Sequence, residues 1–264
     1  MKKTLLAGLA ALAAFGAARS EAGDLAEVTA RGALKVLVVD GSPEFYKLKP
    51  HADPGLEREI LDGFARLHKL KIETLEIPSW SALVPALLEG KGDLIAGSVT
   101  VTEGRLKIIN FTHEVFPTRN VAVTRQPHPA ITSLEQLRAA RVGTIKGTSL
   151  AEAVAAAAVP PAQVDDSFPS GGLPDGLKRG RITAAVIGLE AAVLAHRDDP
   201  ELQLGLFVGP RQSLAFGVRK EDKELTAALD TYISNLRKTP TWSRLVVKYF
   251  GDTALDVLKR AEVE

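Results

Sequence analysis

One stretch, Ser79 to Thr112, constrains the fold of this chain more than any other. Its apolar side chains recur at helical spacing and stop at Gly90, so we expect a helix from about Ser81 to Glu89. The short apolar run Asp93–Gly97 follows almost at once, which is typical of a buried strand in a helix-covered parallel sheet. The stretch therefore predicts an α/β fold.

Small polar residues follow directly where this strand ends. Ser98 and Thr100 leave hydroxyl and backbone N–H groups able to face a ligand, and Arg105 lies just beyond them. A guanidinium group at that point could hold a carboxylate through two parallel hydrogen bonds. Ligands of open α/β sheets bind at the carboxyl ends of strands, so we expect a binding site here. An ordinary surface ion pair of Arg105 with Glu103 or Glu114 is the alternative.

A second strand with a polar end occurs in the later part of the chain. Residues 141–145 read as a strand, and an alanine-rich helix is expected over residues 150–158. Thr148 and Ser149 lie between them. The free N–H groups of a first helical turn point at whatever lies above the strand, which predicts an anion site. Capping of the helix uses the same N–H groups, so both interpretations stay open.

The remaining elements alternate between strands and helices. Runs of β-branched and apolar residues predict strands, and apolar residues at helical spacing predict helices. The strands are expected over residues 34–39, 70–77, 182–187 and 204–208, and the helices over residues 25–31, 55–68, 134–140, 189–196, 225–238 and 240–250. Residues 160–174 read as a loop. Glu57 and Glu59 are expected to be structural residues that pair with neighbours near the surface.

The first 22 residues have the pattern of a cleavable secretory signal peptide. Lys2 and Lys3 form a basic start, an apolar stretch from Thr4 to Ala18 follows, and Ser20-Glu21-Ala22 is a small-x-Ala cleavage site. The apolar stretch is shorter than the roughly 20 residues that span a bilayer, which argues against a membrane anchor. The chain has no cysteine, which excludes disulfides and a lipidated cysteine anchor. We expect a periplasmic protein.

The charge balance gives no sign of a nucleic-acid or membrane partner. The chain has 33 Lys and Arg against 32 Asp and Glu, a formal net charge of +1. Its five histidines are scattered without the spacing of metal ligands. We therefore expect no nucleic-acid partner and no metal. We also expect no cofactor and a monomeric protein.

The motifs resemble, in their order, the polar amino-acid family of periplasmic solute-binding proteins (family 3), the extracellular components of ABC importers. They are Trp80, A-L-V-P-A-L, G-K-G-D, the small-residue loop, T-x-x-R, N-F-T and a closing T-W-S-R-L-V-V-K-Y-F-G, and they run from about Gly32 to Gly251. The resemblance implies a two-lobed fold of the type II periplasmic-binding-protein kind. Each lobe would be a mostly parallel sheet flanked by helices.

Two hinge crossings are expected to join the lobes, one near Val121 to Thr124 and one near Gly209 to Gln212. This places residues 23–122 and 213–264 in lobe 1 and residues 123–212 in lobe 2. The two polar strand ends would then face each other across a cleft, and hinge closure would trap a solute between them.

The resemblance also implies roles for the residues that hold the acidic end of a ligand. Arg105 would hold the ligand's α-carboxylate. Thr100 and Ser149 would add backbone N–H and hydroxyl donors around it, and Thr148 lies beside them at the start of the helix.

Other residues would meet the rest of the ligand. Trp80 would lie along its aliphatic or cationic part, and Ser98 would accept a hydrogen bond at its amino end. The loop after the first strand would bring Phe45 and Glu44 to its side-chain end. Plain core packing is the alternative for Trp80. Trp242, in the closing motif, is expected to be a packing residue.

One departure from the family pattern concerns the strand over residues 182–187. The family usually ends this strand with an aspartate that pairs with the ligand's α-ammonium group, but this chain has Gly188. Glu190 and, in the opposite lobe, Glu44 are the available carboxylates, although Glu190 at a helix start is also favoured by the helix dipole. The ligand is therefore expected to be a small carboxylate-bearing solute, either an amino acid or an organic acid.

The function implied by the resemblance is capture of such a solute for the membrane permease of an ABC importer, without enzymatic activity. A second possibility is a dehydratase resembling cyclohexadienyl or arogenate dehydratases, with Glu190 or Glu44 as general acid. A third is an accessory or sensor domain of a larger periplasmic system.

Overall fold

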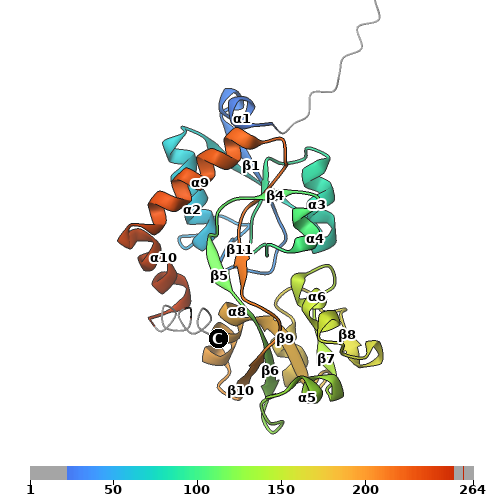
Figure 1. The fold of residues 1–264 in the computed structure, drawn as a ribbon. Helices are drawn as coiled ribbons and strands as arrows, with labels where there is room; N and C mark the ends of the chain where they lie inside the picture. Colours follow the sequence, from blue (N-terminus) through green and yellow to red (C-terminus); the bar gives the residue numbers. More distant parts are fainter. Residues whose placement is uncertain (1–22, 253–257, 259–264) are drawn as a thin grey trace, which may run out of the picture.

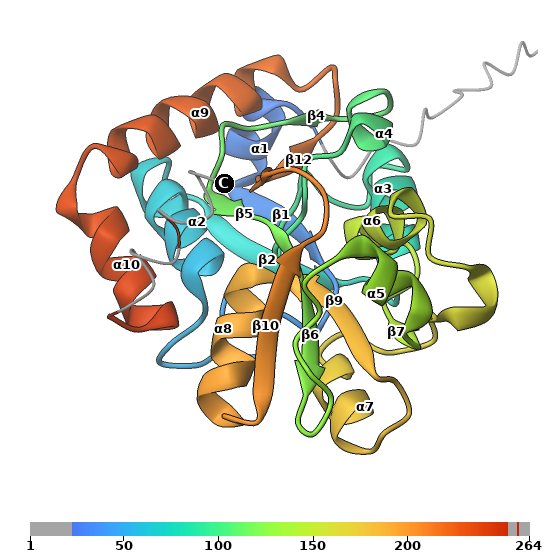
Figure 2. The same cartoon turned by 60° about the horizontal axis from the view of Figure 1, so that its bottom comes forward.

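Two five-stranded sheets, joined by a two-stranded ribbon, form two lobes in the computed structural model of the protein, which describes residues 23–252 and residue 258 (Figure 1). Helices flank both sheets, and the ribbon lies between the lobes (Figures 1 and 2). The predicted α/β two-lobed fold is confirmed. The predicted signal peptide lies outside the described residues.

The first sheet contains β1 (Ala33–Val38), β2 (Lys71–Glu76), β3 (Leu94–Ile95), β4 (Asn110–Phe111) and β12 (Gly217–Val218), in the order β2-β1-β3-β12-β4. β1 pairs in parallel with β2 and β3, whereas β12 is antiparallel to both of its neighbours. Four strands therefore run one way and one runs against them. Since β12 comes from the last fifth of the chain, this lobe is discontinuous in sequence.

The second sheet contains β6 (Asn120–Arg125), β7 (Val142–Gly143), β8 (Val164–Asp165), β9 (Ala184–Gly188) and β10 (Leu202–Phe207), in the order β10-β6-β9-β7-β8. Here β6 is the antiparallel strand, and it lies between β9 and β10 (Figure 2). The short strand β8 falls within the segment that reads as a loop in the sequence.

Helices pack around each sheet. Those of the first lobe are α1 (Leu25–Arg31), α2 (Leu56–Leu67), α3 (Trp80–Leu88), α4 (Glu103–Leu106), α9 (Lys223–Arg237) and α10 (Pro240–Phe250). Those of the second lobe are α5 (Leu134–Ala139), α6 (Ser149–Ala156), α7 (Leu173–Lys178) and α8 (Leu189–Asp198), with a short 3-10 helix over Pro161–Gln163. α2 shows the expected pattern, because its apolar side chains are buried against the first sheet.

The ribbon between the lobes is formed by β5 (Phe116–Thr118) and β11 (Gln212–Leu214), which pair antiparallel. The first crossing was expected at residues 121–124, but these residues lie inside β6, where Val121 pairs with Ile187 of the second sheet. We place the first crossing at β5 instead, whereas β11 begins at Gln212, the last residue of the second expected crossing. The division of the remaining chain into lobes stays a prediction.

An aromatic cluster forms part of the core of the first lobe. Phe45 lies edge-on to Phe116, with 5.4 Å between ring centroids, and 5.2 Å from the ring of Phe250. Trp242 packs against the same core and donates its indole N–H to the carbonyl oxygen of Val115 at 3.1 Å. Trp242 is therefore the packing residue that the sequence predicts.

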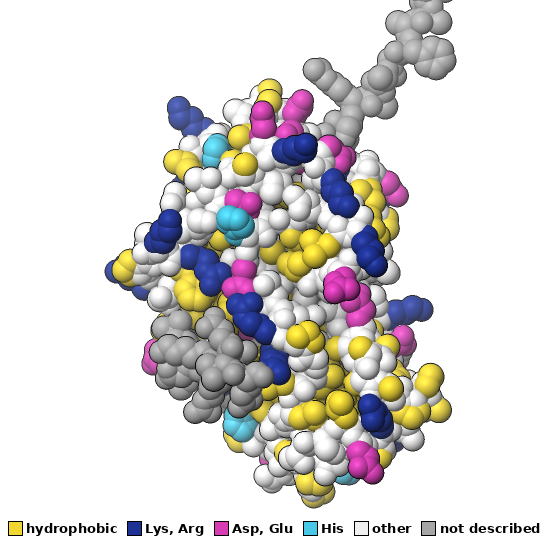
Figure 3. Space-filling view, viewed as in Figure 1, with side chains coloured by type: hydrophobic (Ala, Val, Ile, Leu, Met, Phe, Trp, Pro, Cys, Tyr) yellow, Lys and Arg dark blue, Asp and Glu magenta, His cyan; other side chains and the backbone are white. Residues whose placement is uncertain are grey.

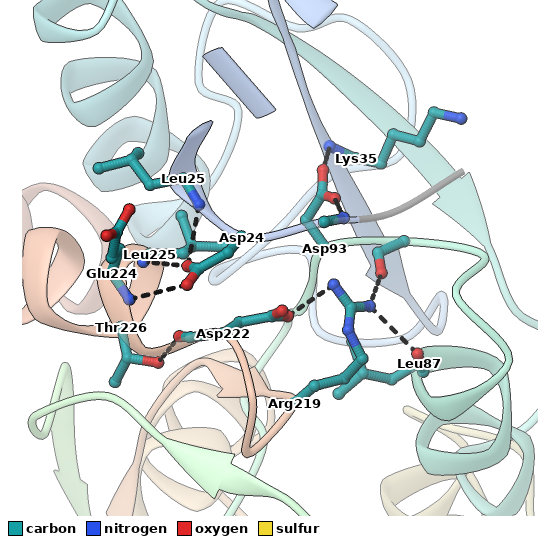
Figure 4. A network of polar contacts seen from close by, with 12 residues as sticks. Asp24, Leu25, Lys35, Leu87, Asp93, Arg219, Asp222, Glu224, Leu225 and Thr226 are labelled. Atoms are coloured by element: carbon teal, nitrogen blue, oxygen red, sulfur yellow. Dashed lines mark hydrogen bonds and ion pairs between the residues drawn. The ribbon is translucent and has the colours of Figure 1, made fainter. Parts of the chain in front are cut away.

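A polar network ties the start of the described chain to the beginning of α9 in this lobe (Figure 4). The Asp24 carboxylate, at the start of α1, accepts the backbone N–H groups of Glu224 at 3.1 Å and Leu225 at 2.6 Å, at the start of α9. Buried Arg219 forms an ion pair with Asp222 at 2.5 Å and donates to two carbonyl oxygens at the end of α3 and the turn after it. The network thus joins residues about 200 positions apart in the chain.

The outer surface carries charges of both signs. Lys and Arg side chains lie scattered among Asp and Glu on the face seen in Figure 3. No helix in the described part of the chain has the length and apolar character required to cross a membrane.

Candidate ligand-binding site

A cavity of about 320 Å³ lies where the carboxyl ends of the two sheets face each other. Nine of the ten residues that the sequence singles out line it: Glu44, Trp80, Ser98, Thr100, Arg105, Thr148, Ser149, Gly188 and Glu190. The tenth is Phe45. The structure therefore brings together residues that span some 150 positions of sequence, whereas their roles toward a ligand stay predictions.

Phe45 requires a correction, because its side chain is fully buried in the aromatic cluster of the first lobe and does not line the cavity. The turn after β1 explains this placement. The N–H of Phe45 donates to the carbonyl oxygen of Ser42, and its own carbonyl oxygen accepts the N–H of Glu57. These bonds fix the turn so that Glu44 faces the cavity and the neighbouring ring faces the core.

Glu57 also differs from the prediction, since it is fully buried rather than near the surface. Its carboxylate accepts the backbone N–H groups of Gly97 at 2.6 Å and Ser98 at 3.0 Å. These two hydrogen bonds hold a strained segment of backbone, because Ser98 has a left-handed φ of 65°. Glu57 thereby fixes the loop that forms one wall of the cavity. Glu59 does pair near the surface, with Lys248 at 2.5 Å.

Arg105 lies in the short helix α4, which Thr102 caps by accepting the N–H of Arg105 at 3.3 Å. Its guanidinium donates from Nη1 to the carbonyl oxygen of Thr100 at 2.7 Å. The structure excludes the alternative pairing with Glu114, because that carboxylate binds Arg211 and Arg237. Within the described residues Arg105 forms no ion pair, and burial lowers the pKa of its guanidinium.

The second lobe contributes the start of α6. Thr148 is the N-cap residue, and its hydroxyl accepts the N–H of Ala151 at 3.5 Å while donating to the carbonyl oxygen of Ile145 at 2.6 Å. Ser149 donates its hydroxyl hydrogen to the Thr100 hydroxyl of the first lobe at 2.9 Å. The capping interpretation of Thr148 is therefore confirmed, and its position on the cavity wall keeps the N-terminus of α6 beside the space for a ligand.

Two further contacts cross the cleft. The indole N–H of Trp80 donates to the Ser170 hydroxyl at 2.8 Å, and Nη2 of Arg105 donates to the carbonyl oxygen of Gly147 at 3.4 Å. The lobes are therefore in contact around the cavity, as in a closed state. Trp80 is only partly buried and combines core packing with a place on the cavity wall.

Several wall residues have no signal in the sequence. Ser42 accepts a hydrogen bond from Ser98 at 2.9 Å, and Ser170, Thr118 and Asn120 line the other side. Ser170 lies in the segment that reads as a loop, where one serine among glycines and prolines resembles any turn residue. The position of Ser170 opposite Trp80 becomes clear only from the three-dimensional structure.

Two carboxyl groups face the cavity from opposite lobes. Glu44 has a pKa raised to about 7, mainly by burial and further by the negative charge of Glu190. Burial also raises the pKa of Glu190, and the hydrogen bond from the Thr118 hydroxyl at 2.5 Å acts in the opposite direction. The described residues contain no group of three His, Cys, Asp or Glu side chains that could hold a metal ion.

Comparison with known proteins finds similarity to periplasmic binding proteins and to about half the length of membrane-bound lytic murein transglycosylases. The histidine-binding periplasmic protein of Escherichia coli (strain K12) is 30% identical over 183 residues, which are 64% of this chain and 68% of that protein. The membrane-bound lytic murein transglycosylase F of Desulfosudis oleivorans is 23% identical over 90% of this chain and 52% of its own length. The chain thus spans about half the length of the transglycosylases it matches.

Solved structures agree in fold. The P235GK mutant of ArgBP from T. maritima superimposes with a TM-score of 0.75 and 25% identity, over 86% of this chain and 99% of that one. The family model of the bacterial extracellular solute-binding proteins, family 3, matches residues 34–252, which include all but the first residue of the two sheets and every residue of the cavity wall. This chain belongs to the bacterial extracellular solute-binding proteins of family 3.

Proposed function

We propose that this protein is the periplasmic solute-binding component of an ABC importer and that it captures a small carboxylate-bearing solute by closure of its two lobes. The observation that carries the proposal is the guanidinium of Arg105, which lies half-buried in the wall of an interlobe cavity without an ion-pair partner among the described residues. A charge that is partly withdrawn from water is costly unless it is paired, and a ligand carboxylate would supply the missing partner.

The surroundings of Arg105 favour an anion. Thr100 and Ser149 place hydroxyl groups beside it, and the N-terminus of α6 brings partial positive charge. The cavity of about 320 Å³ suits a small solute. Closure would then depend on the ligand, because Arg105 and Ser149 belong to elements of opposite lobes.

A thermal-shift screen of amino acids and organic acids tests this proposal. A ligand at 100 times its dissociation constant stabilises the folded state by about 2.7 kcal/mol, which gives a clear rise in melting temperature. Arg105→Ala is expected to abolish the shift, whereas Arg179→Ala, at an exposed surface ion pair, is expected to keep it. The proposal fails if no carboxylate raises the melting temperature or if Arg105→Ala retains the full shift.

One observation favours a second function, a dehydratase resembling cyclohexadienyl dehydratases. Glu44 and Glu190 face the cavity with raised pKa values, as a general acid requires. Incubation with prephenate or arogenate tests this function, and turnover that is lost in Glu190→Gln would support it over pure binding.

A third function is that of a sensor or accessory domain. The murein transglycosylase relatives, about twice as long as the matching region, favour this possibility. Co-purification of the protein with a permease, rather than with a cell-wall enzyme, would support transport.

A further inference from the structure

The residue that follows the predicted cleavage site is held inside the first lobe. Cleavage is expected after Ala22, and the backbone nitrogen of the next residue, Gly23, donates to Oδ1 of Asp93 at 3.2 Å. Asp93 is fully buried and lies immediately before β3. Cleavage would convert this nitrogen from a peptide amide into an α-ammonium group. The atom that gains the charge therefore already faces a buried carboxylate.

Asp93 joins three segments of the lobe at this point. Its Oδ2 accepts the backbone N–H of Lys35 in β1 at 2.7 Å and the guanidinium of Arg31, the last residue of α1, at 2.5 Å. Its Oδ1 accepts the bond from Gly23. The two oxygens thus bind different segments, and Gly23 contributes to the side of the carboxylate that faces the start of the chain.

The space around Gly23 suits a residue without a side chain. A Cβ atom at this position would lie 2.5 Å from Cβ and 2.9 Å from Cγ of Glu27, in the first turn of α1. It would also lie 3.3 Å from Oε2 of the same residue. The closest atoms belong to the base of the Glu27 side chain, which cannot swing aside. Glycine therefore allows the chain to approach Asp93 closely, and a second carboxylate lies nearby.

The polar network that contains Asp93 holds more acidic than basic side chains (Figure 4). The described acids that it joins are Asp24, Asp93 and Asp222, and the bases paired with them are Arg31 and Arg219. At neutral pH these side chains carry three negative charges and two positive ones. An α-ammonium group at residue 23 would bring a further positive charge to the place where acids are in excess.

A solvated chain end is the simpler alternative, and one physical effect favours it. A positive charge ahead of α1 meets the positive end of the helix dipole, which is unfavourable. The Asp24 carboxylate offsets this effect, because it accepts the N–H of Leu25 at 2.8 Å at the same helix end. The dipole also weakens within one turn, whereas a hydrogen bond between charged groups is about twice as strong as a neutral one. The attraction to Asp93 therefore prevails.

We propose that cleavage after Ala22 stabilises the fold, because the new α-ammonium group of Gly23 forms an ion pair with the buried Asp93 carboxylate. Hydrolysis breaks the C–N bond between the two residues, adds the elements of one water molecule and leaves a carboxylate on Ala22 and an ammonium group on Gly23. The amine keeps its proton at neutral pH, since an α-amino group has a pKa near 8. This pairing requires the predicted cleavage and no particular solute.

Mass spectrometry of the secreted protein tests the first step. The full chain is expressed with export, and the mature protein is expected to begin at Gly23. A mature protein with any other first residue overturns the proposal, because its α-ammonium group would lie elsewhere in the chain.

The charge itself is tested by two forms of the mature protein, one with a free amino group at Gly23 and one with that group enzymatically acetylated. Acetylation restores an amide N–H at the same nitrogen and removes only the charge. In urea denaturation at pH 7, the free form is expected to have an unfolding equilibrium constant about tenfold lower, since hydrogen bonds to charged groups exceed neutral ones by roughly this factor. Equal constants, or a more stable acetylated form, overturn the proposal.

Two variants locate the pairing at Asp93. Asp93→Asn is expected to reduce the tenfold difference between the free and acetylated forms to twofold or less, while exposed Glu135→Gln in α5 keeps it. Because Asp93→Asn also removes the partner of Arg31, Arg31→Gln serves as a second variant that retains the carboxylate. Without this guanidinium, Asp93 depends more on the ammonium group, so the difference is expected to exceed tenfold. A difference that persists in Asp93→Asn, or one that does not grow in Arg31→Gln, overturns the proposal.

Gly23→Ala tests the close approach of the chain end without removing any charge. The added methyl group would meet the base of the Glu27 side chain, so residue 23 must move away from Asp93. The difference between the free and acetylated forms is expected to fall as in Asp93→Asn. Solute affinity is expected to stay unchanged, since residue 23 lies outside the cavity wall. A tenfold difference that survives in Gly23→Ala would contradict the geometry on which the ion pair depends.

Discussion

Raising the pH from 5 to 8 is expected to destabilise the folded protein through Glu57. This carboxyl group is fully buried, and burial raises its pKa to about 7, against the opposing effect of the N–H groups of Gly97 and Ser98. The charge of Glu44 raises it further. An unfolded chain returns the group to an ordinary glutamate pKa near 4.5.

The sign and size of the change in unfolding free energy follow from these pKa values. Because the folded-state pKa is the higher one, the folded protein holds the proton more tightly, and this contribution is fully present below pH 4.5 and lost as the pH rises through 7. Integration between pH 5 and 8 gives a loss of about 2.5 kcal/mol in the free energy of unfolding. Glu57→Gln does not titrate and lacks this loss.

Urea denaturation at pH 5, 6, 7 and 8 measures the effect as the unfolding free energy of the unchanged protein minus that of Glu57→Gln, which largely cancels the other titrating groups. Exposed Glu73→Gln is the matched control, and its difference from the unchanged protein should be nearly flat. If the unfolding free energy of the unchanged protein minus that of Glu57→Gln rises with pH, the reasoning is refuted. It would mean that the two backbone N–H bonds outweigh burial and keep the carboxylate ionised.

Three further variants test other parts of the structure. Phe45→Ala is expected to lower the unfolding free energy by about 3–5 kcal/mol while leaving solute affinity unchanged, and a selective loss of affinity would contradict the core placement of the ring. Trp80→Phe removes the indole donor to Ser170 and should weaken solute binding about fivefold in calorimetry, whereas full affinity would show that this contact does not stabilise closure. Arg219→Ala leaves Asp222 buried without its partner and should lower the unfolding free energy by about 3–5 kcal/mol in denaturation experiments. An unchanged unfolding free energy would contradict this expectation.

Local patterns in the sequence predict most of the fold. The helix over residues 25–31 matches α1 at both ends, because Gly32 closes it with a left-handed φ of 71°. The strand β8 escapes prediction since its two residues carry no alternation and are recognised only by pairing with β7. The sequence predicts the first crossing too late in the chain for a similar reason, because only the strands that pair with β6 reveal to which sheet it belongs.

The residues of the site also include some that the sequence predicts and some that it does not. Arg105 and Ser149 are found because a strand end, a small-residue loop and a helix start have recognisable local sequences. The inward turn of Phe45 depends on bonds to Ser42 and Glu57, which a linear pattern does not contain. The Glu190 carboxyl group occupies the space that a side chain at Gly188 would fill. This relation is also beyond prediction, because a glycine that makes room for a neighbouring side chain looks like a glycine that serves the backbone.

The strand order of the first sheet has a consequence for how the chain acquires its structure. β12 lies between β3 and β4, although about 100 residues, including the entire second sheet, separate it from β4 in sequence. During synthesis the first lobe therefore lacks an interior strand until residue 218 has emerged, while every strand of the second sheet is available from residue 207. Contacts this distant in sequence form slowly. The lobe that begins first is therefore completed last, after every strand of the second sheet has been synthesised.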